Sequence, residues 1–263
     1  MTPVNLWICP NEELAPGVAG VLARHWLDEH EKQVADRFLH ARDRRQYVVA
    51  HALVRRALAL ESGIPEAELV IRRSARGRPF LQHPDGGLPR GAGDLDFNLS
   101  HVNGLNLLGT VRGSRIGVDA ERLDREERSI DAVVEMLSPE ERDWVARAPW
   151  GRSRRRRAMR LWTLKEAYSK ARGLGLRLPF DTFSFALAEN RGIEGFRPPG
   201  DDRAGRWRFI ELEPLPGVLA AVALQNDVGR GAVLRLHHGF PWGRSPTYHV
   251  ALPEPVGAPD AYR

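Results

Sequence analysis

The spacing of apolar positions predicts two long helical stretches. Apolar residues recur every three or four positions from about 18 to 60, which is the period of a helix that buries one face. Ser62 and Gly63 follow this stretch as a stop signal. The same period returns over residues 154–171, and Gly173 is placed to end that helix.

A shorter helix is expected in the segment SPEERDWVAR. Ser138 is suited to the N-cap, Pro139 to the first helical position, and Glu141 follows three residues after the cap. A hydroxyl and a carboxylate at this spacing satisfy each other's backbone amide groups, so the segment predicts a helix start.

Short apolar or alternating runs predict strands between the helices. In chain order they are VNLWICP, LVIRRS, FL after the turn GRP, the pair in DFNLSHVNGLNLLGTV, then RIGVDAERL, FDTFSFAL, WRFIEL and GVLAAVAL. A loop rich in Gly, Pro and Asp is expected over 84–93. This order of elements predicts an α+β fold.

The order of elements is repeated along the chain. Residues 1–112 and residues 113–225 each run from an Arg-rich helix through strands to a final apolar strand. We therefore expect two related α+β halves, with a ligand site at the interface between them. Residues 226–263 are rich in Gly, Pro and His, and we expect a partly irregular C-terminal extension.

The composition limits the class of protein. The chain has 263 residues, of which 42% are hydrophobic, so it can bury a core. The single cysteine, Cys9, excludes an internal disulfide framework and a thiolate metal cluster, and we expect it to be an inert strand residue. The first residues lack a basic region followed by a long apolar one, so we expect no signal peptide. No run approaches about 18 apolar residues, and we therefore expect a soluble, cytoplasmic protein.

The charge is positive and comes mainly from arginine. The formal net charge is +5, which favours a polyanionic partner: nucleic acid, a phosphorylated cofactor or an acidic protein. The arginine run at 154–157 is interpreted as a solvated helix start, with docking of an acidic protein as the alternative.

Three carboxylates and a lysine form the first candidate site. Asp119 and Glu121 lie two residues apart in a predicted strand and so face the same way, while Glu166 lies one helical turn before Lys170. Carboxylates without a thiol or imidazole favour a hard cation, above all Mg²⁺. The alternative is a solvated strand end and a surface ion pair. Asp119 follows the apolar run IGV and Glu166 lies in an apolar stripe, which favours the site.

A second candidate group lies in FNLSH. Ser100 and His101 are adjacent on a strand, so they face opposite ways and are poorly placed as a nucleophile and its base. With Asn98, they better suit the binding of a phosphate. The alternative is a capped turn with His101 on the surface.

The third candidate is the basic segment RRSARGRPF. Arg73, Arg76 and Arg78 surround Gly77, which allows close approach of a backbone, and Arg45 adds nearby charge. Guanidinium groups match phosphate oxygens in pairs. The alternative is a solvated basic hairpin.

These motifs together resemble a known family. GRP, FNLSH, IGVDAE and WTLKEAYSKARGLGL occur in the order and approximate spacing of the Sfp-type 4′-phosphopantetheinyl transferases. The resemblance runs from DRFLHARD through LPFDTFSF. It implies a pseudo-dimer of two similar α+β subdomains, with coenzyme A and Mg²⁺, or alternatively Mn²⁺, between them.

The resemblance also implies a reaction and residue roles. The phosphopantetheine arm of coenzyme A would pass to a serine hydroxyl of a carrier protein, releasing 3′,5′-ADP. Asp119, Glu121 and Glu166 resemble the metal ligands, and Glu166, Lys170 and His101 the catalytic groups. Whether Glu166 or a metal-bound water takes the serine proton is left open. The implied coenzyme A contacts are Arg45, Arg73, Arg76, Gly77, Arg78, Asn98, Ser100, His101 and Lys170.

The implied partners are acidic acyl or peptidyl carrier proteins. We expect the protein to be a monomer that binds neither nucleic acid nor membrane. The chain departs from the family pattern at Val34, where a basic residue is frequent; Lys32, Arg37 or Arg45 could replace it. Ala120, the middle residue of D-x-E, leaves any third ligand from this strand to backbone or water. The alternatives are a non-enzymatic nucleic-acid-binding protein, which lacks recognisable motifs here, and a family member that binds without catalysis.

Overall fold

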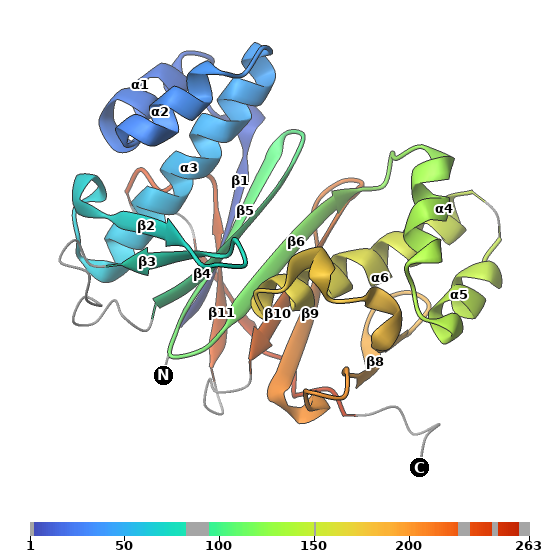
Figure 1. Ribbon diagram of the computed structural model, residues 1–263. Coiled ribbons are helices and arrows are strands. Elements are labelled where there is room, and N and C mark those ends of the chain that lie inside the picture. Colours follow the sequence, from blue (N-terminus) through green and yellow to red (C-terminus); the bar gives the residue numbers. More distant parts are fainter. Residues whose placement is uncertain (1–2, 83–94, 150, 226–231, 244–246, 258–263) are drawn as a thin grey trace. The chain divides into compact units, whose positions relative to one another are not determined.

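Figure 1 presents the computed structural model, which describes residues 3–82, 95–149, 151–225, 232–243 and 247–257. The chain divides into two compact units. The N-terminal unit comprises residues 2–113 and 233–250, and the C-terminal unit comprises residues 114–232 and 251–263. The segment after residue 225 is therefore divided between the two units. The loop expected over 84–93 lies outside the described residues.

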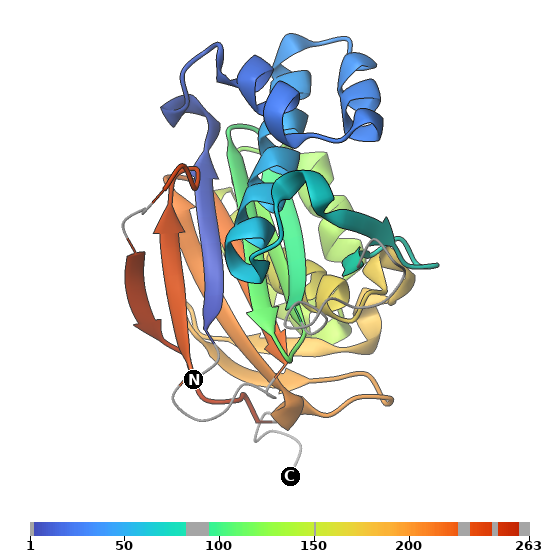
Figure 2. The same cartoon turned by 90° about the vertical axis from the view of Figure 1, so that its left-hand side faces the viewer.

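A five-stranded sheet organises the N-terminal unit, in the order β12-β11-β1-β5-β4. Its central strand β1 pairs antiparallel with β5 and parallel with β11, which comes from the far end of the chain (Figure 2). The strands are β1 (Val4–Pro10), β4 (Leu95–Val102), β5 (Leu105–Arg112), β11 (Val233–His238) and β12 (Thr247–Ala251). The predicted C-terminal extension thus contributes two strands to this sheet.

The predicted helical stretch over 18–60 forms three helices rather than one. Leu27 is extended, and Asp28 then starts a new helix through a capping box with Glu31. His40 is extended as well, before the longest helix begins. Gly63 ends that helix in the left-handed conformation, as the sequence predicts. The helices are α1 (Val18–Trp26), α2 (Glu29–Asp36) and α3 (Ala41–Ser62).

The core of the N-terminal unit lies between α3 and the sheet. Leu53 and Ala57 of α3 belong to the same buried cluster as Trp7 of β1, Phe97 of β4 and Leu108 of β5. Cys9 is buried there, and burial raises the pKa of its thiol to about 12, which confirms the expected inert residue. A separate hairpin follows α3, with β2 (Val70–Arg73) and β3 (Pro79–Gln82).

The C-terminal unit is built on a three-stranded antiparallel sheet in the order β6-β10-β9. Helix α6 (Arg152–Ala171) packs across β6 and β10 (Figure 1). The strands are β6 (Ile116–Arg122), β9 (Trp207–Leu215) and β10 (Val218–Gln225), beside a hairpin of β7 (Ser184–Leu187) and β8 (Ile193–Arg197). Two shorter helices precede α6, α4 (Glu127–Glu135) and α5 (Pro139–Ala146).

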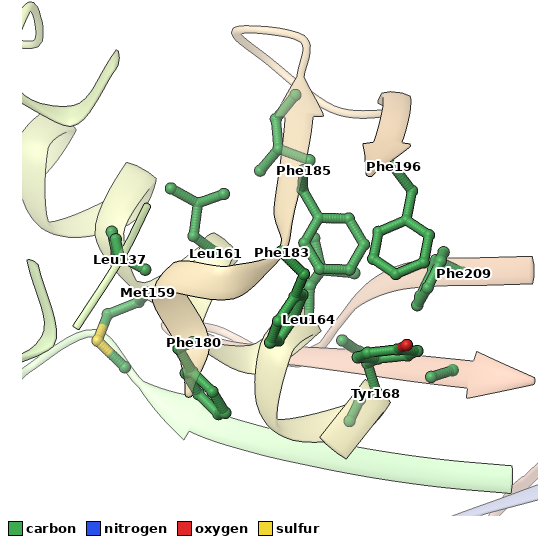
Figure 3. Packing of buried hydrophobic residues seen from close by; sticks show 14 of the residues in the cluster. Leu137, Met159, Leu161, Leu164, Tyr168, Phe180, Phe183, Phe185, Phe196 and Phe209 are labelled. Carbon is green, nitrogen blue, oxygen red and sulfur yellow. The ribbon is translucent and has the colours of Figure 1, made fainter. Parts of the chain in front are cut away.

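Aromatic side chains fill the core between α6 and the hairpin. Tyr168 of α6 lies 5.1 Å from Phe183, 5.0 Å from Phe196 and 5.0 Å from Trp207, measured between ring centroids (Figure 3). Its hydroxyl donates a hydrogen bond of 2.7 Å to Asp202. Aromatic pairs of this kind contribute about 0.5–1.5 kcal/mol each beyond the area that they bury. The core therefore holds α6 firmly on its apolar face.

The α+β class is confirmed, and both units place one long helix on a sheet. The capping box of Ser138 and Glu141 is present at the start of α5 as predicted. Two expectations differ: α4 and β8 were not predicted, and the segment FDTFSFAL begins with the 3₁₀ turn η4 (Phe180–Thr182) before β7. The expected ligand site between the halves stays a prediction.

Candidate functional site

Strand β6 and helix α6 approach each other so closely that only glycine fits at Gly117. A Cβ there would overlap the backbone carbonyl of Ala167 and lie 2.5 Å from the backbone nitrogen of Ala171. Side chains two residues apart on a strand share a face, so Asp119 and Glu121 face α6 as Gly117 does. The glycine of the IGVDAE segment therefore sets the distance between the strand carboxylates and the helix.

Asp119 and Lys170 form an ion pair across this contact. Lys170 Nζ lies 2.6 Å from Asp119 Oδ1, and Asp119 is only 4% exposed. Burial by itself lowers the pKa of Lys170, but the Asp119 ion pair and the charges of Glu166 and Glu121 outweigh burial and raise it. Lys170 is therefore a cation at neutral pH, held among carboxylates.

Glu121, the second strand carboxylate, is held on both oxygens. The indole Nε1–H of Trp162 donates a 2.9 Å hydrogen bond to Oε1, and Arg125 pairs with Oε2. Burial, followed by the negative charge of Asp119, raises the pKa of Glu121 against the effect of Arg125. In the sequence, Trp162 belongs to the apolar stripe around Glu166 and begins the motif WTLKEAYSKARGLGL. The hydrogen bond from its ring nitrogen to Glu121 was not predicted.

Glu166 is the most strongly perturbed of the three carboxylates. Burial, together with the charges of Asp119 and Glu121, raises its pKa to about 7, and Lys170 opposes this effect. Burial is the largest of these effects, and the charges of the two strand carboxylates add to it. Glu166 thus exchanges a proton near neutral pH, as a general base must.

The donor chemistry of this group fits a divalent cation. All three groups are carboxylates, which are ligands that Mg²⁺ and Mn²⁺ prefer, and a cation would relieve the repulsion among them. Lys170 and Arg125 currently pair with Asp119 and Glu121. Accordingly, no three His, Cys, Asp or Glu side chains are gathered around one point in the described part of the chain.

A pocket of about 390 Å³ opens in the N-terminal unit between α3 and the end of β4. Three rings line it in series: Phe38 lies 5.3 Å from Tyr47, and Tyr47 lies 4.0 Å from His51 in a stacked arrangement. Arg42 and His101 are also in the wall. Aromatic rings with basic groups suit a ligand that has a flat ring and a phosphate. Sequence reasoning missed this pocket, although 42, 46, 47 and 51 share the helical spacing of one face.

The structure separates the members of the FNLSH segment. His101 is exposed and lines the pocket, whereas Asn98 and Ser100 are buried and alternate with it along β4, on the other face of the sheet. Ser100 and His101 therefore face opposite sides of β4, as the sequence predicted. Only His101 of these three joins the pocket.

The basic segment forms a tight turn between β2 and β3. Gly77 has φ of +86°, which glycine adopts without strain, and its carbonyl accepts a 3.0 Å hydrogen bond from Arg73. Arg78 is directed inward, where it pairs with Asp96 at 2.6 Å. Arg76 is exposed. The three arginines thus have different surroundings: Arg73 and Arg76 are exposed, and Arg78 is partly buried.

Arg45, the fourth predicted arginine, has its guanidinium group surrounded by backbone carbonyls. It donates to the carbonyl oxygens of Asn11, Leu14, Ala15 and Pro16, at 2.7–3.2 Å. This arrangement fixes the segment after β1 to helix α3. A direct contact with a ligand would require Arg45 to give up these bonds.

The arginine run at the start of α6 is ion-paired rather than freely solvated. Its four guanidinium groups bind carboxylates of the same unit, so they join α6 to its surroundings. The pairs are Arg154 with Glu127 and Asp131, Arg155 with Glu127, Arg156 with Glu213, and Arg157 with Glu189. The interpretation as a solvated helix start is therefore wrong, because these charges are engaged within the unit.

A buried ion pair lies directly behind the carboxylate site. Lys165, the residue before Glu166, is 0% exposed and pairs with Glu141 at 2.8 Å. Its ammonium group also donates to the carbonyl oxygens of Phe180 and Phe183, at 2.6 and 2.5 Å. Lys165 therefore fixes the rotation of α6 against α5 and η4, and with it the direction of Glu166. From the sequence alone, Lys165 was only one position of the motif WTLKEAYSKARGLGL, and no separate role was predicted for it.

Two family models match adjoining parts of the chain. Residues 19–111 match the model described as 4′-phosphopantetheinyl transferase, N-terminal, and residues 115–223 match the 4′-phosphopantetheinyl transferase superfamily. The chain belongs to the 4′-phosphopantetheinyl transferase family. The second match contains β6 and α6, so the carboxylate site lies inside the family region.

Several curated members of this family are similar to the chain. A phosphopantetheinyl transferase of Thraustochytrium sp. is 28% identical over 185 residues, which is 64% of this chain and 59% of the relative. An L-aminoadipate-semialdehyde dehydrogenase-phosphopantetheinyl transferase of Xenopus laevis is 25% identical over 202 residues, 73% of this chain and 66% of the relative. The 4′-phosphopantetheinyl transferase HetI of Nostoc sp. is 27% identical over 222 residues, 84% of this chain and 87% of the relative. The matched region thus spans less than two thirds of the first two relatives.

Within the described ranges, no helix has the length and apolar character needed to cross a bilayer.

Proposed function

We propose that the protein transfers the 4′-phosphopantetheine arm of coenzyme A to a serine hydroxyl of an acyl or peptidyl carrier protein. The serine oxygen forms a bond to the β-phosphorus of coenzyme A, the bond from that phosphorus to the bridging oxygen breaks, and 3′,5′-ADP leaves. The observation that carries this proposal is the group of Asp119, Glu121 and Glu166 around Lys170, within the region matched by the family model.

Asp119, Glu121 and Glu166 would hold Mg²⁺, or Mn²⁺ in its place. The bound cation would neutralise the pyrophosphate oxygens of coenzyme A. Lys170 already lies on Asp119 Oδ1 and is charged, so a short movement of its ammonium group places it beside the same anionic oxygens. We assign Lys170 to the charge that develops on the leaving 3′,5′-ADP.

We assign the serine proton to Glu166. Its pKa of about 7 makes the carboxylate basic enough to accept a proton and still largely ionised in mildly alkaline solution. Asp119 is less suited to this role, because its Oδ1 is engaged by Lys170.

The nucleotide end of coenzyme A is assigned to the N-terminal unit. The pocket with the Phe38–Tyr47–His51 series offers rings for the adenine base, and His101 in its wall offers a donor for phosphate. Arg76 and the backbone at Gly77 are accessible for further phosphate contacts, and Arg73 borders them. We keep Asn98, Ser100 and Arg78 as coenzyme A contacts in this proposal, and assign Arg45 to support of the pocket wall.

The partner would be an acidic carrier protein, which the net charge of +5 favours by electrostatic steering. We propose that the protein acts as a monomer, because one chain supplies both units. We further propose that it acts in the cytoplasm. A salt titration of carrier binding tests the steering: affinity should fall as ionic strength rises.

The test of the activity is incubation with an apo carrier protein, coenzyme A and MgCl₂, followed by intact mass measurement of the carrier. The proposal predicts a mass gain of one phosphopantetheine group and release of 3′,5′-ADP in equal amount. Unchanged mass with several unrelated carriers would overturn it.

A further inference from the structure

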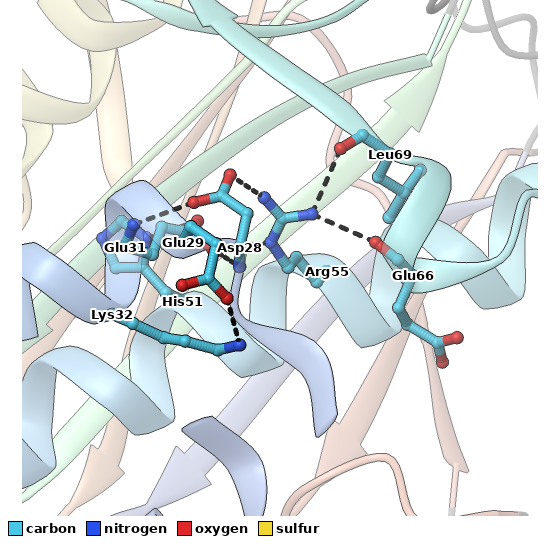
Figure 4. A network of polar contacts seen from close by, with 8 residues as sticks. All are labelled: Asp28, Glu29, Glu31, Lys32, His51, Arg55, Glu66 and Leu69. Carbon is cyan, nitrogen blue, oxygen red and sulfur yellow. Dashed lines mark hydrogen bonds and ion pairs between the residues drawn. The ribbon is translucent and has the colours of Figure 1, made fainter. Parts of the chain in front are cut away.

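A chain of charged side chains leads from the core of the N-terminal unit to the pocket. Its inner end is Arg55, which is 1% exposed. Arg55 Nε donates to Glu31 Oε2 at 2.6 Å, and the same guanidinium group pairs with Asp28 and donates to the carbonyl oxygens of Glu66 and Leu69 (Figure 4). Glu31 is therefore fixed at the junction of α2 and α3.

His51 is the outer end of this chain. Its Nδ1 lies 2.9 Å from Glu31 Oε1, on the carboxylate that Arg55 holds from the other side (Figure 4). Burial by itself raises the pKa of Glu31, but the bond to His51 and the charge of Arg55 outweigh it and lower the pKa. Glu31 is thus an acceptor at neutral pH, so Nδ1 of His51 carries a proton and donates it.

This arrangement leaves the second ring nitrogen of His51 for the pocket. The ring is stacked on Tyr47 and lines the pocket wall. Among the described residues, Nε2 has no hydrogen-bond partner. A ring that lines a cavity, with one nitrogen anchored to a buried carboxylate, is held in place to contact a ligand there through its other nitrogen.

Other candidate cations near the pocket are already engaged. Lys32 pairs with Glu29 at 2.7 Å on the surface, and Arg45 is bound to four carbonyl groups. Position 34, where the family pattern led us to expect a basic residue, is Val34. The basic groups that line the pocket itself are Arg42, His51 and His101.

We propose that His51 binds the 3′-phosphate of coenzyme A through Nε2, and that Glu31 and Arg55 hold its ring in position for this contact. The inference rests on the proposed function, which assigns the pyrophosphate to the carboxylate site of the C-terminal unit and leaves the phosphate monoester to this pocket. A phosphate monoester carries between one and two negative charges near neutral pH and binds best to a fixed cationic donor. Contact with the phosphate therefore needs a second proton on the ring, at Nε2. The resulting cation would lie between the phosphate and the Glu31 carboxylate, which is 2.9 Å from Nδ1.

Two variants of His51 separate ligand binding from a purely structural role. In His51→Asn the amide nitrogen can replace Nδ1 and keep the bond to Glu31, but nothing replaces Nε2. In His51→Gln the amide reaches toward the place of Nε2. Binding of coenzyme A and of 3′-dephospho-coenzyme A to the full chain is measured by titration calorimetry, with thermal unfolding as the control for folding.

The wild type should bind coenzyme A more tightly than the dephospho form. His51→Asn should lose roughly tenfold in affinity for coenzyme A and keep its affinity for the dephospho form, since one charge-assisted hydrogen bond is lost. His51→Gln should retain part of the difference. An unchanged affinity ratio in a folded His51→Asn protein would overturn the inference, as would an equal loss for both ligands. Failure of the wild type to bind either ligand would instead contradict the proposed function.

Discussion

The ammonium nitrogen of Lys170 lies 2.6 Å from Oδ1 of Asp119, one of the three carboxylates proposed to hold the metal ion. The two residues lie on different elements, β6 and α6, whose backbones touch at Gly117. If the proposed cation binds the same oxygen of Asp119, it would compete with Lys170 for that oxygen.

Replacement of this lysine should affect metal binding and catalysis in opposite directions. Lys170→Met removes the competing charge, so Mg²⁺ should bind several-fold more tightly in titration calorimetry, while transfer falls by about 10²–10³-fold because the leaving group loses its cation. Arg128→Met, at an exposed ion pair with Glu126 in the same unit, is the matched control and should leave both unchanged. Weaker Mg²⁺ binding in Lys170→Met would contradict the competition.

Gly117→Ala should separate the strand from the helix. The added Cβ meets backbone rather than a flexible side chain, so β6 or α6 must shift, at a cost of about 1–3 kcal/mol in the free energy of unfolding. The displaced carboxylates should reduce transfer more than the loss of stability explains. Val118→Ala, at a buried position on the other face of β6, is the control. A folded Gly117→Ala protein with the activity of Val118→Ala would refute this role of the glycine.

The pH dependence of transfer should follow Glu166. With a pKa of about 7, the carboxylate is protonated below this pH, so kcat/KM should rise through about pH 7. The measurement is the initial rate of carrier modification from pH 5.5 to 8.5 at a low and at a high Mg²⁺ concentration, and the inflection near pH 7 is expected at the low one. Because a bound cation favours the carboxylate form, the inflection should move to lower pH as the Mg²⁺ concentration rises. A rate independent of pH over this range would speak against Glu166 as the base.

Glu166 should also reduce stability in the metal-free protein. Its folded pKa lies above the ordinary value of 4.5, so the unfolded chain releases its proton first and stability falls as pH rises from 4.5 to about 7. Since the side chain is partly exposed, we expect a loss of only about 1–2 kcal/mol. Urea unfolding with a chelator should therefore find Glu166→Gln more stable than the wild type at pH 8 and equal to it at pH 4. The opposite order at pH 8 would contradict the perturbed environment.

Loss of one partner of the buried Lys165–Glu141 pair should be costly. Lys165→Met leaves a carboxylate buried without its cation, which costs about 3–5 kcal/mol in the free energy of unfolding. The double variant Lys165→Met with Glu141→Gln keeps the hydrogen-bonding shape without a charge and should recover part of this loss in denaturant titration. If the double variant is no more stable than Lys165→Met, the penalty does not come from the unpaired charge.

Sequence patterns predicted most elements because local signals specify them. The Ser138 capping box and the Gly63 stop signal involve residues within one turn of each other, and the structure has both. The stretch over 18–60 was predicted as a single helix because its apolar period continues across Asp28, where the capping box with Glu31 begins a new helix. The pairing of β11 with β1 joins residues more than 200 positions apart, and no periodicity encodes it.

The residue types of the candidate site could be predicted from the sequence. The ion pairs that Lys170 and Arg125 form with Asp119 and Glu121 could not. Spacing alone places Asp119 and Glu121 on one strand face, but the approach of Glu166 depends on the backbone contact at Gly117. The role of Arg45 depends on four carbonyl groups of a distant loop. The His51–Glu31–Arg55 chain was missed because it joins two helices whose separate patterns give no sign of it.

The most direct test of the account compares carrier modification by the wild type and by Asp119→Ala, measured by intact mass with coenzyme A and MgCl₂. The account predicts a stoichiometric mass gain with the wild type and none with Asp119→Ala over the same time, while circular dichroism and coenzyme A binding to the pocket are retained. Modification by Asp119→Ala at the wild-type rate would contradict the central claim that the carboxylates between β6 and α6 are the site of transfer.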